Sequence, residues 1–190
     1  MNPSLQGRAQ VVSLLDEGYA CRSSNLTLSV ELAQKALSIS RELGDKALIA
    51  KSLSQHALFS MIQGEYDAAI SMSKEALAYF EELKDELGVA SAKYNLGGVY
   101  YKTDNYYLGM AYLTDCVNIY RKNNDHQNLL SSMVCVIVAN SKQHSPECSG
   151  DAPNVDGRNP VAGLDLLVLK EKLLEPEKEG DKNYEVGSKK

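Results

Sequence analysis

Seven of the eleven tyrosines lie between residues 94 and 120, which makes this the densest run of tyrosines in the sequence. Phenol groups can donate protons in an active site, or they can form a surface that buries the rings and leaves the hydroxyl groups to hydrogen-bond. An active site would need at least one acid and one base held together, and no such pair accompanies these tyrosines. The run therefore favours packing or binding over catalysis.

A metal site is the next kind of chemistry that the residue types allow. His144 and Cys148 lie four residues apart, but Pro146 stands between them and no further His or Cys is close in the sequence. A zinc site with four protein ligands therefore lacks partners. The motifs GxSxG, GxxxxGK[ST] and HExxH, which mark nucleophilic, phosphate-binding and zinc-protease sites, do not occur. We predict no enzyme activity, no metal and no cofactor.

Two other candidates receive structural roles. His56 lies on the face of a predicted helix, where we expect a structural residue with satisfied hydrogen bonds rather than a base. Gly97 and Gly98 fall in the middle of a predicted helix. We expect that their missing side chains admit a neighbouring helix rather than a phosphate.

Composition excludes several classes of protein. The net charge of −5 and the lack of a Lys and Arg cluster argue against nucleic-acid binding, which requires basic groups gathered on one surface. The longest apolar run, MVCVIVA at 133–139, is far shorter than the ~20 residues that span a bilayer. The N-terminus lacks the apolar core of a signal peptide. Four cysteines without a CxxC pair favour reduced thiols and a cytoplasmic location.

The elements that position these side chains recur at one constant offset, which is the step from Asp45 to Asp85 and again from Asp85 to Asp125. At this offset the segment KALSISRELGDKALIAKSL at 35–53 aligns with EALAYFEELKDELGVASAK at 75–93. Apolar residues within each unit are mainly three, four or seven apart, which is typical of helices. The expected helices are 7–21, 26–43, 46–62, 65–83, 86–102, 105–122 and 126–142. They form antiparallel pairs that must stack to bury their apolar faces.

One helix pair carries the signature of a known family. Leu96-Gly97-x-x-Tyr100 in the first helix, followed by Gly109 and Cys116 in the second, resembles the tetratricopeptide repeat. This resemblance implies an all-α, right-handed superhelical solenoid of antiparallel helix pairs that binds other proteins without catalysis. The 40-residue period exceeds the family's usual ~34 residues and resembles longer variants found in signalling proteins. HEAT-type repeats, with ~40–47 residues, are the structural alternative.

The resemblance also implies a ligand surface, because first helices of such repeats line a concave groove that takes a peptide or helix of a partner protein. The expected groove residues are Lys51, Ser54, Gln55, Leu58, Met61, Ser91, Tyr94, Asn95, Gly98, Tyr101, Lys102, Val134 and Val138. Of these, Met61, Tyr94 and Tyr101 are the expected binding hot spots. Only Asn95 fits a clamp for a C-terminal carboxylate, so we do not expect a chaperone-tail clamp.

Four other tyrosines have a different expected role. They are Tyr100, Tyr106, Tyr112 and Tyr120, which we expect to fill the packing between repeats.

The domain organisation changes after residue 142. We expect repeats over 1–142, comprising three helix pairs and the first helix of a fourth, a Pro- and Gly-rich loop insertion at 143–159, and the second helix of the fourth pair within 160–190, followed by a charged tail. An array cut short in a fifth unit motivates an alternative: the chain is the sensory segment of a larger histidine kinase, nucleotide cyclase or transcription regulator. An uncapped last unit also exposes an apolar face, which leaves homodimerisation open.

Overall fold

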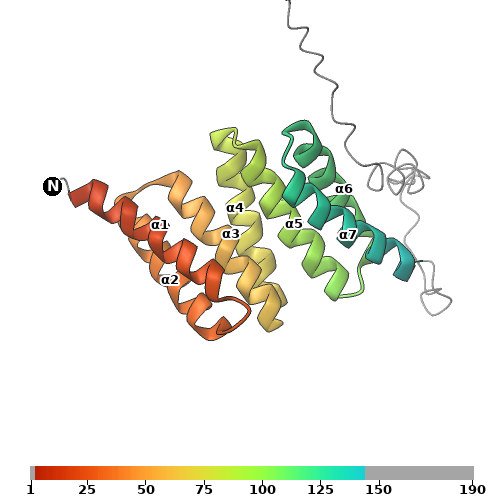
Figure 1. The fold of residues 1–190 in the computed structure, drawn as a ribbon, viewed down its shortest axis with the longest axis horizontal. Coiled ribbons are helices and arrows are strands. Elements are labelled where there is room, and N and C mark those ends of the chain that lie inside the picture. The colour runs from red at the N-terminus through yellow and green to blue at the C-terminus, as the bar shows by residue number, and fades with distance from the viewer. Residues whose placement is uncertain (1–2, 144–190) are drawn as a thin grey trace, which may run out of the picture. The chain divides into compact units, whose positions relative to one another are not determined.

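The computed structural model describes residues 3–143, with side chains from 5 to 137. This part of the chain consists of seven α-helices and contains no strand (Figure 1). The helices are α1 (Pro3–Cys21), α2 (Leu26–Leu43), α3 (Lys46–Gln63), α4 (Tyr66–Leu83), α5 (Glu86–Lys102), α6 (Tyr106–Lys122) and α7 (His126–Gln143). The all-α helical-repeat fold is confirmed. Six helices begin and end within one residue of the predicted bounds, whereas α1 starts four residues early, at a proline that suits the first turn of a helix.

Repeating caps explain why the helices begin where they do. Asp45, Asp85 and Asp125 each accept a hydrogen bond from the backbone N–H three residues on, at 3.2, 2.9 and 3.1 Å. This satisfies donors that the first turn of a helix leaves unpaired. Asn25 and Asn105 cap α2 and α6 in the same way. The three aspartates are therefore helix N-caps one repeat apart. The two asparagines are N-caps two repeats apart, because Glu65, at the position between them, makes no side-chain cap hydrogen bond.

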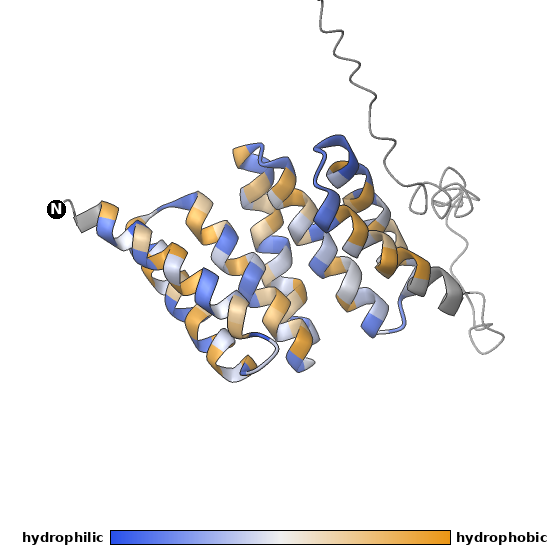
Figure 2. Cartoon of the chain, viewed as in Figure 1, coloured by the Kyte–Doolittle hydropathy of each residue, from blue (hydrophilic) through white to orange (hydrophobic). Residues whose placement is uncertain are grey.

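Each helix packs against the next one in the chain, and the odd-numbered helices also contact one another, α1 with α3, α3 with α5 and α5 with α7. The odd-numbered helices thus form a layer of their own. Apolar and polar residues both occur along the helices (Figure 2). Buried clusters overlap from pair to pair: Leu48 packs with α1 and α2, while Leu53 of the same helix packs with α4 and α5.

The glycines in the middle of α5 allow two close helix crossings. A Cβ atom on Gly97 would lie 2.7 Å from Cγ of Leu113 on α6, and one on Gly109 would lie 3.1 Å from the carbonyl oxygen of Gly97. A Cβ on Gly98 would lie 2.7 Å from Sδ of Met61 on α3. The prediction that the missing side chains admit a neighbouring helix is confirmed.

Ion pairs join the two helices of a pair at equivalent places with exchanged charges. Lys46 at the start of α3 pairs with Glu82 near the end of α4. One repeat later, Glu86 pairs with Lys122 at 2.6 Å, from the positions equivalent to Lys46 and Glu82. The hydrogen bonds from Lys122 and Asn123 lower the pKa of Glu86. Local pairing of opposite charges is retained although the order of the charges is reversed.

Most of the tyrosines that we expected to pack internally do so, although not all between repeats. The rings of Tyr100 and Tyr112 stack with centroids 5.7 Å apart, joining the two helices of a single pair. Tyr120 is buried with Cys116 and Ala90. The expectation that Tyr100 and Tyr112 pack between repeats is therefore corrected: they pack within one repeat. Gly97 and Gly109 bring α5 and α6 close enough for the two tyrosine rings to meet.

Candidate functional site

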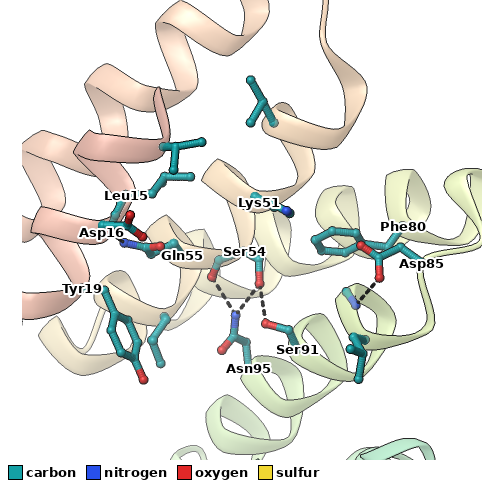
Figure 3. A pocket seen from close by; sticks show the side chains of 15 residues that line it. Leu15, Asp16, Tyr19, Lys51, Ser54, Gln55, Phe80, Asp85, Ser91 and Asn95 are labelled. Carbon is teal, nitrogen blue, oxygen red and sulfur yellow. Dashed lines mark hydrogen bonds between the residues drawn. The ribbon is translucent and has the colours of Figure 1, made fainter. Parts of the chain in front are cut away.

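A hollow of about 520 Å³ lies on the layer of odd-numbered helices, between α1, α3 and α5 (Figure 3). A second hollow of about 450 Å³ continues it towards α7. The two share residues from three helices: Tyr19, Leu58, Leu87, Ser91 and Asn95. We call the continuous surface formed by the residues that line either hollow the groove. Its position on the first helix of each pair follows from the layered packing.

The floor of the groove is tied together by hydrogen bonds between successive first helices. The amide nitrogen of Asn95 donates to the carbonyl oxygen of Ser54 at 2.7 Å, and the hydroxyl groups of Ser54 and Ser91 lie 3.0 Å apart (Figure 3). Gln55, one repeat before Asn95, donates to the carbonyl oxygen of Leu15. The two amides thus bind the backbone of the preceding first helix. They order the floor before any ligand arrives.

Exposed apolar side chains stand beside this polar floor. Tyr19 of α1 is 49% exposed and Leu87 of α5 is 42% exposed, and both border the two hollows. The guanidinium carbon of Arg22 lies 3.7 Å from the centre of the Tyr19 ring, an attractive cation–π contact that holds the ring in place. The arrangement offers apolar contact area around prearranged hydrogen-bonding groups, which suits recognition of a polypeptide.

Tyr94 links the groove to α7. It lines the second hollow, is half-buried, and its hydroxyl oxygen lies 3.5 Å from Sγ of Cys135. Burial, followed by the contact with Cys135, raises the pKa of the Tyr94 phenol, so the side chain is neutral. A neutral phenol with an internal partner serves as a contact surface rather than as a base.

Comparison with known families identifies the repeats. The family model described as tetratricopeptide repeat matches residues 48–122, from within α3 to the last residue of α6. Residues 48–122 carry tetratricopeptide repeats. The match includes the Leu96-Gly97-x-x-Tyr100 signature and favours this family over HEAT-type repeats. No curated protein matches the chain. Tetratricopeptide repeats generally mediate protein–protein interaction and do not catalyse reactions.

The tetratricopeptide array brings together seven of the thirteen residues predicted for the groove. Those in the hollows are Lys51, Ser54, Gln55, Leu58, Ser91, Tyr94 and Asn95. Five others have described side chains and do not line these two hollows. Met61 and Gly98 face each other at the α3–α5 crossing, Tyr101 packs edge-on against Tyr106, and Lys102 and Val134 are exposed. The side chain of Val138 lies outside the described part of the structure.

The prediction missed the contribution of the first helix of the array. Val12, Asp16 and Tyr19 of α1 line the first hollow, and Leu87 of α5 joins them. The residues predicted for the groove begin at Lys51, in the second unit, and include none from α1. The residue one repeat before Leu58 is Gly18 rather than Tyr19, so the offset alone would have found the helix but not its largest contact residue.

His56 departs from its predicted role. Its Nδ1 atom is buried without a hydrogen-bond partner in the described residues, so the expected satisfied histidine is wrong. The residue occupies the place of the signature Leu96 and of Val136, both of which are buried. Burial lowers the pKa of the His56 imidazole, and the charge of Glu65 opposes this effect more weakly. The repeat therefore places a polar ring where its neighbours have an aliphatic side chain.

The described residues, 3–143, offer neither a metal site nor a membrane span. No group of three or more His, Cys, Asp or Glu side chains in that range could hold a metal ion. The predicted insertion at 143–159 lies outside the described residues except for Gln143, and so do His144 and Cys148 within it. The predicted helix and tail at 160–190 lie outside them as well. The described helices include none with the length and apolar content needed to cross a membrane.

Proposed function

We propose that the groove binds a segment of another protein, as a peptide or a helix, and that the protein acts through this binding without catalysis. The observation that carries the proposal is the continuous groove across the first helices of the array, with exposed Tyr19 and Leu87 beside a hydrogen-bonded floor. Covering large apolar side chains that are in contact with water makes the free energy of binding more favourable. Tyrosine is one of the residue types enriched among interaction hot spots.

The proposed hot spots are centred on the two hollows. Tyr94 remains among them, because it lines the second hollow. Tyr19 and Leu87 join it in place of Met61 and Tyr101, whose side chains contact Gly98 and Tyr106. Side chains already committed to packing offer a ligand less new contact area.

Selection from a random dodecapeptide display library tests the proposal. The full chain should enrich binding peptides, and Leu87→Glu should weaken the binding of the selected peptides at least about tenfold. Leu83→Glu is a matched control, because Leu83 is 41% exposed against 42% for Leu87 but lines neither hollow. Equal effects of the two substitutions, with both variants folded by circular dichroism, would show that the groove is not the binding site.

We further propose that the exposed face of α7 supports self-association. Leu130 and Ile137 are exposed, whereas the residues one repeat earlier, Ala90 and Gly97, are buried against α6. The face therefore has the position of a helix-docking surface. Light scattering at two protein concentrations tests this. The mass of the wild type should rise with concentration, whereas Ile137→Lys should keep the mass of a monomer at both concentrations. A monomeric wild type at both concentrations would contradict it.

A reducing, cytoplasmic location is also proposed. Within the described residues Cys21, Cys116 and Cys135 are free thiols. Cys116 is buried and donates to the carbonyl oxygens of Ala90 and Tyr112, so it serves as a small core residue.

A further inference from the structure

Three aspartates begin α3, α5 and α7 at equivalent positions, but only the first has a cationic partner within the described residues. Asp45 caps α3 and also forms an ion pair with Arg8 of α1, at 2.9 Å. The pair covers Asp45, whose side chain is only 11% exposed. Arg8 thus neutralises the cap of the next first helix in the layer.

The equivalent cation is replaced one repeat later. The residue that follows Arg8 by one repeat is Leu48, which cannot pair with a carboxylate. Oδ1 of Asp85 accepts the hydrogen bond from the Gly88 N–H, and Asp85 forms no ion pair within the described residues. Unlike Asp45, Asp85 lines the groove. Arg8 neutralises the carboxylate of Asp45, whereas the equivalent carboxylate of Asp85 can still pair with a ligand.

Two further carboxylates border the groove. Asp16 lies on the α1 wall of the first hollow and is exposed, and Asp125 borders the second hollow. Among the described residues, Lys51 is the one basic residue that lines either hollow. Arg22 adds a second positive charge at the rim, over the Tyr19 ring. Three carboxylates against these two cations still leave a net negative charge, which favours positively charged ligands and disfavours acidic ones.

Resting on the proposed function, we infer that the ligand of the groove is a basic amphipathic polypeptide segment. An Arg or Lys of the ligand pairs with Asp85, as Arg8 pairs with Asp45, and apolar ligand residues cover Tyr19 and Leu87. Asp16 provides a second acidic contact on the opposite wall. A C-terminal carboxylate fits poorly, because the amide nitrogen of Asn95 already donates to Ser54.

The test uses the same dodecapeptide library with the full chain. The selected peptides should be enriched in Arg or Lys next to apolar residues. For the tightest peptide, Asp85→Asn should weaken binding about tenfold at low salt, because a charge-assisted hydrogen bond is lost. Replacing the ligand's basic residue by Gln should have the same effect and remove the sensitivity to Asp85→Asn. Asn is itself a good N-cap, so the variant keeps the start of α5.

Two variants make the test specific. Asp45→Asn changes the equivalent cap outside the groove and should leave peptide affinity unchanged. Asp16→Asn changes an exposed residue that folding does not need, and should weaken binding by a smaller factor. Peptides that depend on Leu87 but are acidic or neutral, or that bind Asp85→Asn and Asp16→Asn as tightly as the wild type, would overturn the basic-ligand inference and leave the groove intact. Failure to select any peptide that depends on Leu87 would overturn the proposed function itself.

Discussion

Replacing His56 by leucine should stabilise the protein. The Nδ1 atom of His56 is buried without a partner in the described residues, and an unsatisfied buried polar atom costs about 1–3 kcal/mol. Leucine removes that atom and is the residue found one repeat later, at Leu96, where it is fully buried. Because His56 itself is only partly buried, we expect a gain near the lower end, about 1 kcal/mol, in the free energy of unfolding. Urea titration at neutral pH measures it.

The same substitution should change the pH dependence of stability. Burial lowers the pKa of His56 in the folded state below its ordinary value of 6.5, so the unfolded chain takes up the proton first as the pH falls. The stability associated with the neutral ring is therefore complete above pH 6.5 and is lost as the pH falls from there towards the lowered pKa. The advantage of His56→Leu over the wild type should grow between about pH 7.5 and about pH 5.5.

The reciprocal substitution provides the control. Leu96→His places the same ring in the equivalent but fully buried site, and should cost about 3 kcal/mol or more and introduce a steeper loss of stability on acidification. If His56→Leu is less stable than the wild type, or if its advantage does not change with pH, then the imidazole has a hydrogen-bond partner in solution and the reasoning from burial is refuted.

Two further predictions concern the backbone. Gly97→Ala should lower the free energy of unfolding by about 1–3 kcal/mol, because the added Cβ would stand 2.7 Å from Cγ of Leu113 in the core. Gly98→Ala should cost less than about 1 kcal/mol, because the flexible thioether of Met61 can move away. Equal losses in urea titrations would contradict this contrast. Lys84→Gly should stabilise by about 0.5–1 kcal/mol, since Lys84 has a left-handed φ of 57°; an unchanged or lower Tm would show that this conformation carries no strain.

The helices could be predicted closely because their ends are encoded locally. Asp45, Asp85 and Asp125 supply side-chain acceptors for the first turn of three helices, so the recurring acid marks a boundary that needs no tertiary information. Left-handed residues recur with the same offset just before these caps, at Gly44 and Lys84. Because a cap and a turn return once in every repeat, they fix both the length and the number of helices in the described part of the chain.

The groove was harder to predict, because its walls depend on how far each helix is turned and how closely it approaches its neighbours. Tyr19 is a groove residue although the position one repeat before Leu58 is Gly18. The spacing predicts Met61 as a contact residue for the ligand, but the absence of a side chain at Gly98 lets Met61 pack there instead. Sequence spacing gives the face of a helix to within about one residue, and a side chain one position away points about 100° elsewhere.

Equivalent polar positions in the repeats join successive first helices, which leaves the other positions on these helices free for recognition. Gln55 and Asn95 both donate to the backbone of the preceding first helix, so the floor keeps one arrangement along two interfaces. A ligand that enters the groove meets groups that are already ordered and loses less conformational entropy on binding. Affinity then depends mainly on the walls, where Tyr19 and Leu87 supply apolar area and Asp85 supplies charge. Substitutions in the walls should therefore change which segment binds, whereas substitutions in the floor should first change whether the array holds its shape.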